Sequence, residues 1–369
     1  MSIATVAPDA IDLAFSGRFG FGIYRWAYLP FDVPAGVQRI RVSTSHEDFA
    51  VGGLARNVLD LGIFGPAGYD LGNAAGFRGW SGGARDGFVI SSTHATPGYL
   101  AGPIDPGVWA VALGPVVLSP WGMAWQVHIT MERGESVTAP PDSEPVVATV
   151  SPSVVGARWY RGDLHLHTVH SDGQRHLGEL ASTAHASGLD FIVSTEHNTN
   201  AGNRAWPACD TGGLLVIPGE EVTTRHGHWL AVGLPPRAWV DWRYGPRDGV
   251  FPRFAAEVRQ AGGLVVAAHP SVPLPGSAWE FGLPTWMPSR YGTAGGTSMT
   301  NCHFASGSGC CGRTDALWRS AAATRTASIS RSARRRPSCM PVNCRHPRSL
   351  MGYVAGVRIW PDRAMSHWN

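Results

Sequence analysis

The segment Gly162-Asp-Leu-His-Leu-His-Thr-Val-His-Ser-Asp-Gly173 carries the most informative pattern in the chain. His165 and His167 alternate with two leucines, so on a β-strand both imidazoles project from one face while the leucines pack on the other. Asp172 follows in a Ser-Asp-Gly turn, from which its carboxylate can reach back over the strand end. On its own, the His-x-His pattern fits a divalent-metal site and a pair of partly exposed histidines about equally well.

The apolar runs downstream change that balance, because each of them adjoins a residue type that binds metals. Together with the first segment they contribute His165, His167, Asp172, His197, Glu221, His228 and His269. Mixed imidazole and carboxylate ligands suit Zn²⁺, Mn²⁺ or Fe²⁺. Seven ligands are too many for one tetrahedral ion, so we expect two or three divalent ions that share bridging carboxylates. Scattered surface histidines are the weaker alternative.

Strand and helix patterns alternate from Trp159 onward. We expect helices at 178–187 and 254–261, and buried strands at 191–194, 214–218, 229–233 and 264–268. Strand–helix alternation with polar residues at the ends of the strands is typical of an α/β barrel.

The first part of the chain has a different pattern. Short runs rich in Val, Ile and aromatic residues, separated by Gly, Pro, Asp and Ser, predict an all-β sandwich or jelly roll over residues 1–133. We expect residues 1–150 to fold independently and to bind no catalytic metal. Four tryptophans here fit core packing better than a sugar-stacking surface: Trp80, Trp109, Trp121 and Trp125. Residues 134–157 are rich in Pro, Ser and Val and predict a linker, which places the α/β domain at 158–283.

Composition bounds the cellular setting. No apolar run approaches the roughly 20 residues of a membrane span, and the N-terminus shows no export signal. Cys209 is the only cysteine before residue 284, which indicates a reducing compartment, and we expect a cytoplasmic protein without membrane contact.

The last 86 residues differ in charge from the rest. Residues 1–283 hold 18 Arg and 25 acidic residues, whereas residues 284–369 hold 12 Arg and 2 acidic residues. Helical and strand periodicity end near Leu283. A basic tail suggests nucleic-acid binding, but this one has few aromatic residues and no known motif, so we do not expect a nucleic-acid partner.

Residues 161–270 resemble the PHP domain (polymerase and histidinol phosphatase family), in the CehA/McbA-type metallohydrolase branch. The resemblance rests on Asp163-x-His165-x-His167-Thr with Ser-Asp172-Gly, on Thr-Glu-His197-Asn, on Gly-Glu-Glu221, on Gly-His228 and on Ala-His269-Pro. It selects Glu221 over Glu220 as the ligand.

The resemblance implies a distorted (β/α)7 barrel with a metal cluster at its mouth, preceded by a β-sandwich. It also implies hydrolysis of a small phosphoester by a metal-activated hydroxide. His226 is then a candidate proton donor to the leaving oxygen, and Arg161 and Arg175 are candidate phosphate ligands, with solvent-exposed roles as the alternative for all three. Carbamate or ester hydrolysis is a second reading. A non-catalytic metal- or carbohydrate-binding protein is the third.

One family motif is absent: no Asp-x-His occurs after His269. The genetic code suggests a reason. Trp286-Met287-Pro288 is encoded TGG-ATG-CCN, which read one base earlier contains a forced Asp-Ala, and Trp318–Thr326 permits an apolar strand that ends in Asp-Ala-His. We therefore expect a one-base frameshift near Leu283. Residues 284–369 would then be an out-of-frame, disordered tail, the last barrel strands would be missing, and activity would be impaired.

Overall fold

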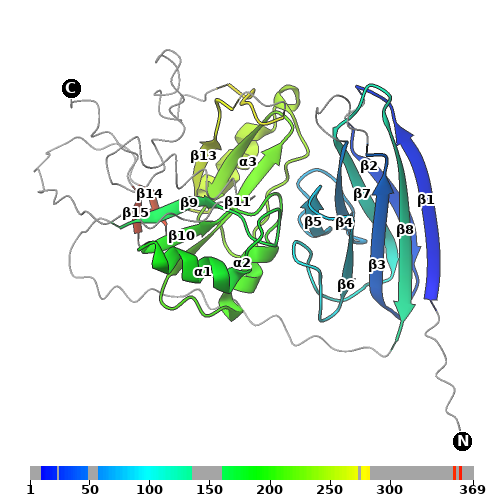
Figure 1. The fold of residues 1–369 in the computed structure, drawn as a ribbon, viewed down its shortest axis with the longest axis horizontal. Helices are drawn as coiled ribbons and strands as arrows, with labels where there is room; N and C mark the ends of the chain where they lie inside the picture. Colours follow the sequence, from blue (N-terminus) through cyan, green and yellow to red (C-terminus); the bar gives the residue numbers. More distant parts are fainter. Residues whose placement is uncertain are drawn as a thin grey trace, which may run out of the picture.

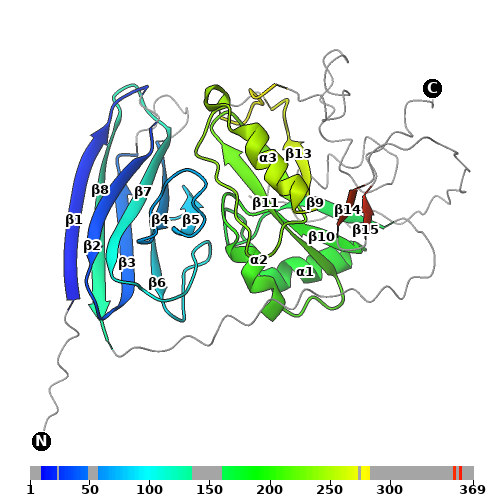
Figure 2. The same ribbon diagram turned by 180° about the vertical axis from the view of Figure 1, so that it is seen from behind.

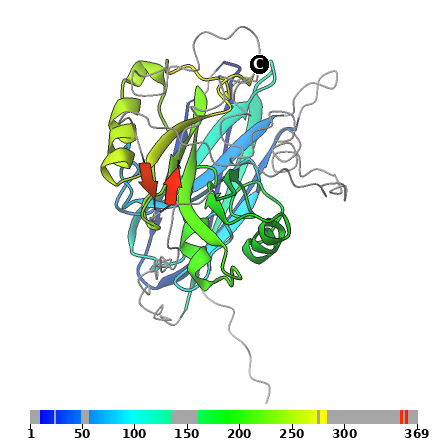
Figure 3. The same cartoon turned by 90° about the vertical axis from the view of Figure 1, so that its left-hand side faces the viewer.

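The computed structural model describes most of the first 282 residues and two short strands near the C-terminus. Except for Gly134, the predicted linker at 134–157 lies outside the described residues, and so does most of the predicted tail. Figures 1 and 2 show the two halves of the molecule side by side from opposite sides, and Figure 3 looks along the line that joins them. The described segments are residues 10–22, 25–48, 57–134, 160–272, 276–282, 352–354 and 357–359.

The first half consists of two four-stranded antiparallel sheets, which appear in blue and cyan in Figure 1. One sheet has the strand order β1-β8-β3-β6 and the other β2-β7-β4-β5. The strands are β1 (Ala10–Phe19), β2 (Ala27–Val33), β3 (Val37–His46), β4 (Val58–Phe64), β5 (Phe77–Gly82), β6 (Gly87–Ser91), β7 (Gly107–Val117) and β8 (Met123–Arg133).

Alternating apolar residues hold these two sheets together. In β8, for example, Val127, Ile129 and Met131 are buried while the residues between them are more exposed, as the two-residue period of a strand requires. They join a cluster with Ile40 and Val111 from other strands. Of the four tryptophans singled out in the sequence, three are buried, and only Trp121 is exposed, at 59%.

The second half contains an open, mixed five-stranded sheet in the order β13-β12-β11-β10-β9. Strands β9, β10 and β11 are parallel, whereas β12 is antiparallel to both β11 and β13. The predicted helices at 178–187 and 254–261 are present as α1 and α3. The elements are β9 (Gly162–Leu166), α1 (Leu177–Ala186), β10 (Phe191–Ser194), α2 (Ala201–Ala205), β11 (Leu215–Thr224), β12 (Gly227–Val232), α3 (Phe251–Gln260) and β13 (Leu264–Ala268), with one-turn 3-10 helices at Trp206–Ala208 and Pro246–Asp248.

The predicted (β/α)7 barrel is wrong. A barrel needs a crossover helix between successive parallel strands, but β11 runs on to Thr224 and the chain then reverses at Arg225 and His226 to form β12 directly. The described residues contain three α-helices, and α2 has only five residues. The buried strands predicted at 214–218 and 229–233 therefore extend toward each other as β11 and β12, which pair directly.

Aromatic side chains from both halves share one core. Trp242 packs against Trp80 at 4.4 Å and against Trp26 at 6.0 Å between ring centroids, and Trp239 stacks on Phe77 at 4.3 Å. All belong to or border a single buried cluster that also takes in α3. This shared core counts against the expectation that residues 1–150 fold independently.

Two further features complete the described chain. Strands β14 (Gly352–Val354) and β15 (Val357–Ile359) form a short antiparallel pair within the basic tail. Among the described helices, none combines the length and the apolar character that crossing a membrane requires.

Candidate metal centre

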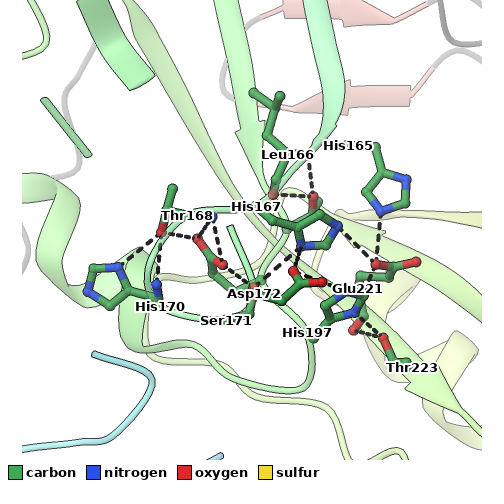
Figure 4. Close-up of polar contacts among 12 residues, drawn as sticks. His165, Leu166, His167, Thr168, His170, Ser171, Asp172, His197, Glu221 and Thr223 are labelled. Atoms are coloured by element: carbon green, nitrogen blue, oxygen red, sulfur yellow. Dashed lines mark hydrogen bonds and ion pairs between the residues drawn. The ribbon is translucent and has the colours of Figure 1, made fainter. Parts of the chain in front are cut away.

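The carboxylate of Glu221 lies at the centre of a cluster of five imidazoles. Glu221 is completely buried in β11. Its Oε2 lies 2.9, 3.2 and 3.0 Å from ring nitrogens of His165, His167 and His197 (Figure 4). Its Oε1 lies 3.1 and 3.0 Å from ring nitrogens of His228 and His269. One nitrogen of each of the five rings therefore lies within ion-pair distance of the same carboxylate.

The sheet explains why residues so far apart in sequence meet here. Parallel strands end at the same edge of a sheet, and an antiparallel neighbour begins there. His167, His197 and His269 follow the ends of β9, β10 and β13, while His228 lies near the start of β12, opposite Ala268. His165 reaches the cluster from β9 itself.

The environment of the two leucines differs from the expectation. Leu166 packs with α1, whereas Leu164 packs on the cluster that contains Val193 and Ile217, so the two do not share one face. The register between β9 and β10 shifts after Ile192, and this irregularity disrupts simple alternation.

Asp172 lies over the exposed side of the cluster. Its Oδ1 is 3.6 Å from His197 Nε2 and 3.9 Å from His167 Nδ1, and its side chain is 59% exposed (Figure 4). The tight turn that returns it needs Gly173, because a Cβ there would lie 2.4 Å from the His167 carbonyl oxygen. Asp172 is therefore the cluster member most open to solvent.

Buried polar groups hold the ligands in place. The Glu196 carboxylate accepts hydrogen bonds from the Thr168 backbone at 3.1 Å and from the hydroxyls of Thr168 and Ser171, each at 2.5 Å. On the other side of the cluster, His197 Nδ1 lies 2.6 Å from Thr223 Oγ1. These contacts fix the loop after β9 and orient one ring, which is the arrangement expected around metal ligands.

Backbone strain also gathers at the cluster. Asn198 and His269 are the two described non-glycine residues with positive φ, at 56° and 33°. The Asn198 side chain compensates by accepting the Thr223 N–H at 2.7 Å and donating to the Thr223 carbonyl at 3.3 Å. Such strain is characteristic of functional sites.

Burial and charge determine the protonation of the cluster. Burial favours a higher pKa for Glu221, but His165 and His197 outweigh it and hold the pKa of this carboxyl well below its usual range. Burial lowers the pKa of His165 to about 4 and lowers the pKa of His228 as well. Burial also opposes charge on His197, yet Glu221 and Asp172 hold its pKa well above the usual value.

The donor set therefore fits divalent metal ions. Two groups lie with their donor atoms within 4.8 Å of one another: His165, Glu221 and His269 form one, and His167, His197 and Glu221 form the other. An ionised carboxylate beside imidazoles such as His165 and His228, whose pKa values are lowered, presents the lone pairs that Zn²⁺, Mn²⁺ or Fe²⁺ bind, and His197 would release its proton to a bound ion. Glu221 belongs to both groups, so it is placed to bridge two ions.

The three candidates for substrate and proton-transfer roles make other contacts in the described part of the chain. His226 pairs with Glu280 at 2.8 Å. Arg161 precedes β9, at the opposite edge of the sheet from His167, and its backbone N–H donates to Asp190. Arg175 lies in the loop after β9, where its carbonyl accepts the Val169 N–H at 3.0 Å.

The sequence patterns predicted no role for three residues near the cluster: Glu196, Thr223 and Glu220. Glu196 directly precedes His197, a position that is a usable signal for a support residue. Glu220 is fully buried, accepts the Val240 N–H at 3.0 Å, and has a pKa that burial raises well above the usual value. It faces away from the imidazoles that Glu221 contacts, in accord with the choice of Glu221 as ligand.

Comparisons with known proteins add little. No family model and no curated protein matches the chain. A weak structural match is to the CBM22-1-GH10 modules of the Clostridium thermocellum endo-1,4-β-D-xylanase 10B in complex with xylohexaose, with a TM-score of 0.17 and 9% identity. It covers 50% of this chain and 35% of the xylanase chain. Similarity at that level supports no argument about fold or function.

Proposed function

We propose that this protein is a metal-dependent hydrolase that acts on a small phosphoester. The observation that carries the proposal is the buried Glu221 carboxylate with five imidazole nitrogens within 3.2 Å. The motifs similar to the PHP family, from His165 to His269, support the same conclusion, although the barrel expected with them is not part of it.

The residues divide the work as follows. Glu221 would be shared between two ions, the five histidines would each supply a ring nitrogen, His197 after losing its proton, and Asp172 would close the solvent-exposed side, from which a substrate would reach the cluster. Divalent ions in such a site lower the pKa of a water molecule and offset negative charge on a phosphoryl or carbonyl oxygen. Glu196 and Thr223 hold the loop and the His197 ring in position while this happens.

His226, Arg161 and Arg175 have no part in this proposal. A carbamate or ester is the alternative substrate class, since the same chemistry acts on a carbonyl carbon. The proposal includes a cytoplasmic location, which rests on the single cysteine among residues 1–283.

Metal analysis of the full chain tests the proposal. We expect the wild type to purify with transition metal, and the double variant His165→Ala/His167→Ala to lose most of it, because each substitution removes a ligand from one of the two groups. His128→Ala, on the exposed side of β8, is the matched control and should leave the metal content unchanged. Equal metal content in the double variant and the wild type would refute the site.

Activity assays on metal-loaded protein then separate the substrate classes. Hydrolysis of bis(p-nitrophenyl) phosphate supports the phosphoesterase, whereas hydrolysis of an aryl carbamate alone supports the alternative. Metal binding without either activity would leave a metal-binding protein.

A further inference from the structure

The β-sandwich touches the loop that carries His167 and Asp172. Arg85, in the turn between β5 and β6, donates a hydrogen bond from Nη2 to the carbonyl oxygen of Val169. Val169 lies between the two ligands, two residues after His167 and three before Asp172. A sandwich side chain therefore holds the backbone of a ligand loop that belongs to the other half.

A second contact brings the two backbones together. Gly98 has a φ of 96°, and a Cβ there would lie 2.7 Å from the His170 carbonyl oxygen and 2.8 Å from that of Trp80. The Gly98 carbonyl in turn accepts the Thr199 hydroxyl at 2.9 Å. Any side chain at position 98 would push the loop away, so the close fit depends on glycine.

The turn that carries Arg85 is itself fixed within the sandwich. Ser81 Oγ lies 2.8 Å from the hydroxyl of Tyr99, which donates to the Leu61 carbonyl at 3.2 Å. The Ala84 N–H donates to the Ser81 carbonyl at 3.1 Å. Next to this turn, Trp80 packs in the aromatic core shared with the second half. The guanidinium is thus presented from a rigid base.

The loop has two anchors. Glu196 holds Thr168 and Ser171 from inside the second half, and the sandwich holds Val169 and His170 from outside. The other donor group is independent of this loop, because His165 is on β9 and His269 follows β13.

We propose that Arg85 is a positioning residue for one of the two donor groups of the metal centre, the group of His167, His197 and Glu221 over which Asp172 lies. This inference rests on the proposed metal site. It gives the sandwich a role in that site, because the sandwich holds the loop that carries two of the ligands. Arginine suits the task because its charged fork makes a strong hydrogen bond to a carbonyl that would otherwise lose its partner.

The test is a metal titration of the full chain with two stepwise affinities, measured by competition with a chromophoric chelator for Mn²⁺ or Zn²⁺. Arg85→Met removes the donor and keeps the length of the side chain. We expect one of the two affinities to fall by about tenfold, as for other residues that support metal ligands, and the second to stay within about twofold. Arg85→Lys keeps a donor and should restore part of the lost affinity.

Arg41→Met is the matched control, since Arg41 is an exposed arginine of β3 whose guanidinium lies 4.0 Å from the Glu132 carboxylate. Thermal unfolding of the metal-free variants accompanies the titration. Unchanged affinities in Arg85→Met would overturn the inference, as would equal losses at both steps together with a lower melting temperature. A wild type that binds no metal would instead overturn the proposed function itself.

Discussion

The two halves of the molecule differ in what they bury. The interior between the sandwich sheets is almost wholly apolar, with Ile40, Val111 and Ile129 among its members. The second half buries carboxylates that are at most 1% exposed: Glu196, Glu220, Glu221 and Asp241. Burying such groups is costly unless each finds hydrogen bonds or opposite charge. The sandwich therefore has the composition of a stabilising scaffold, and the second half has that of a functional site.

The shared aromatic core shows that the sandwich is not structurally separate from the second half. Trp242 is 1% exposed and packs between Trp26 and Trp80. We predict that Trp242→Ala destabilises the protein by about 3–5 kcal/mol, the usual cost of removing a large buried aromatic side chain. Denaturant unfolding followed by far-UV circular dichroism measures it. Two transitions, of which only one shifts, would mean that the halves unfold separately.

A half-buried carboxyl of the sandwich, outside the apolar interior between its sheets, offers a second way to test the comparison. Burial raises the pKa of Asp60 on β4 to about 7, although Arg225 and His197 of the other half act against the rise. A carboxyl with a raised pKa contributes stability below its unfolded value of 3.8 that is lost as the pH rises through 7.

Asp60→Asn imitates the neutral carboxyl, so we predict a stabilising effect that is absent near pH 4 and grows to about 4 kcal/mol at pH 8. Thermal unfolding of both proteins across this pH range measures the difference. A variant that is less stable than the wild type at pH 8 would show that the electrostatic attraction of Arg225 outweighs the cost of burial.

The smallest effect is expected from the basic tail. Within the described part of the chain, the donor atoms of the cluster come from residues 165–269. If the tail contributes no ligand, a chain truncated after residue 283 should bind as much metal as the full chain. We predict that the two metal contents differ by no more than about a fifth. Loss of one ion on truncation would assign a ligand to the tail. Resequencing the gene tests the frameshift: coding bases that exclude Asp-Ala-His in the shifted frame would rule it out.

The sequence patterns predicted which residues meet more accurately than they predicted the fold. His165, His197 and His269 adjoin apolar runs, so their meeting at one sheet edge could be anticipated from strand direction alone. The barrel could not be excluded in the same way, because the reversal at Arg225-His226 lacks the Asn-Gly or Asp-Gly signature of a tight hairpin. Nothing local in the sequence links Arg85 to Val169. The two residues are 84 positions apart, and their contact depends on how the sandwich packs against the second half.

The number of ions that depend on Glu221 tests the central claim most directly. Because Glu221 belongs to both donor groups while His269 belongs to one, metal analysis of the wild type, Glu221→Gln and His269→Ala should give different stoichiometries. The account predicts at least two ions per chain in the wild type, loss of both in Glu221→Gln, and loss of one in His269→Ala. Glu221→Gln protein that retains the wild-type metal content would contradict it.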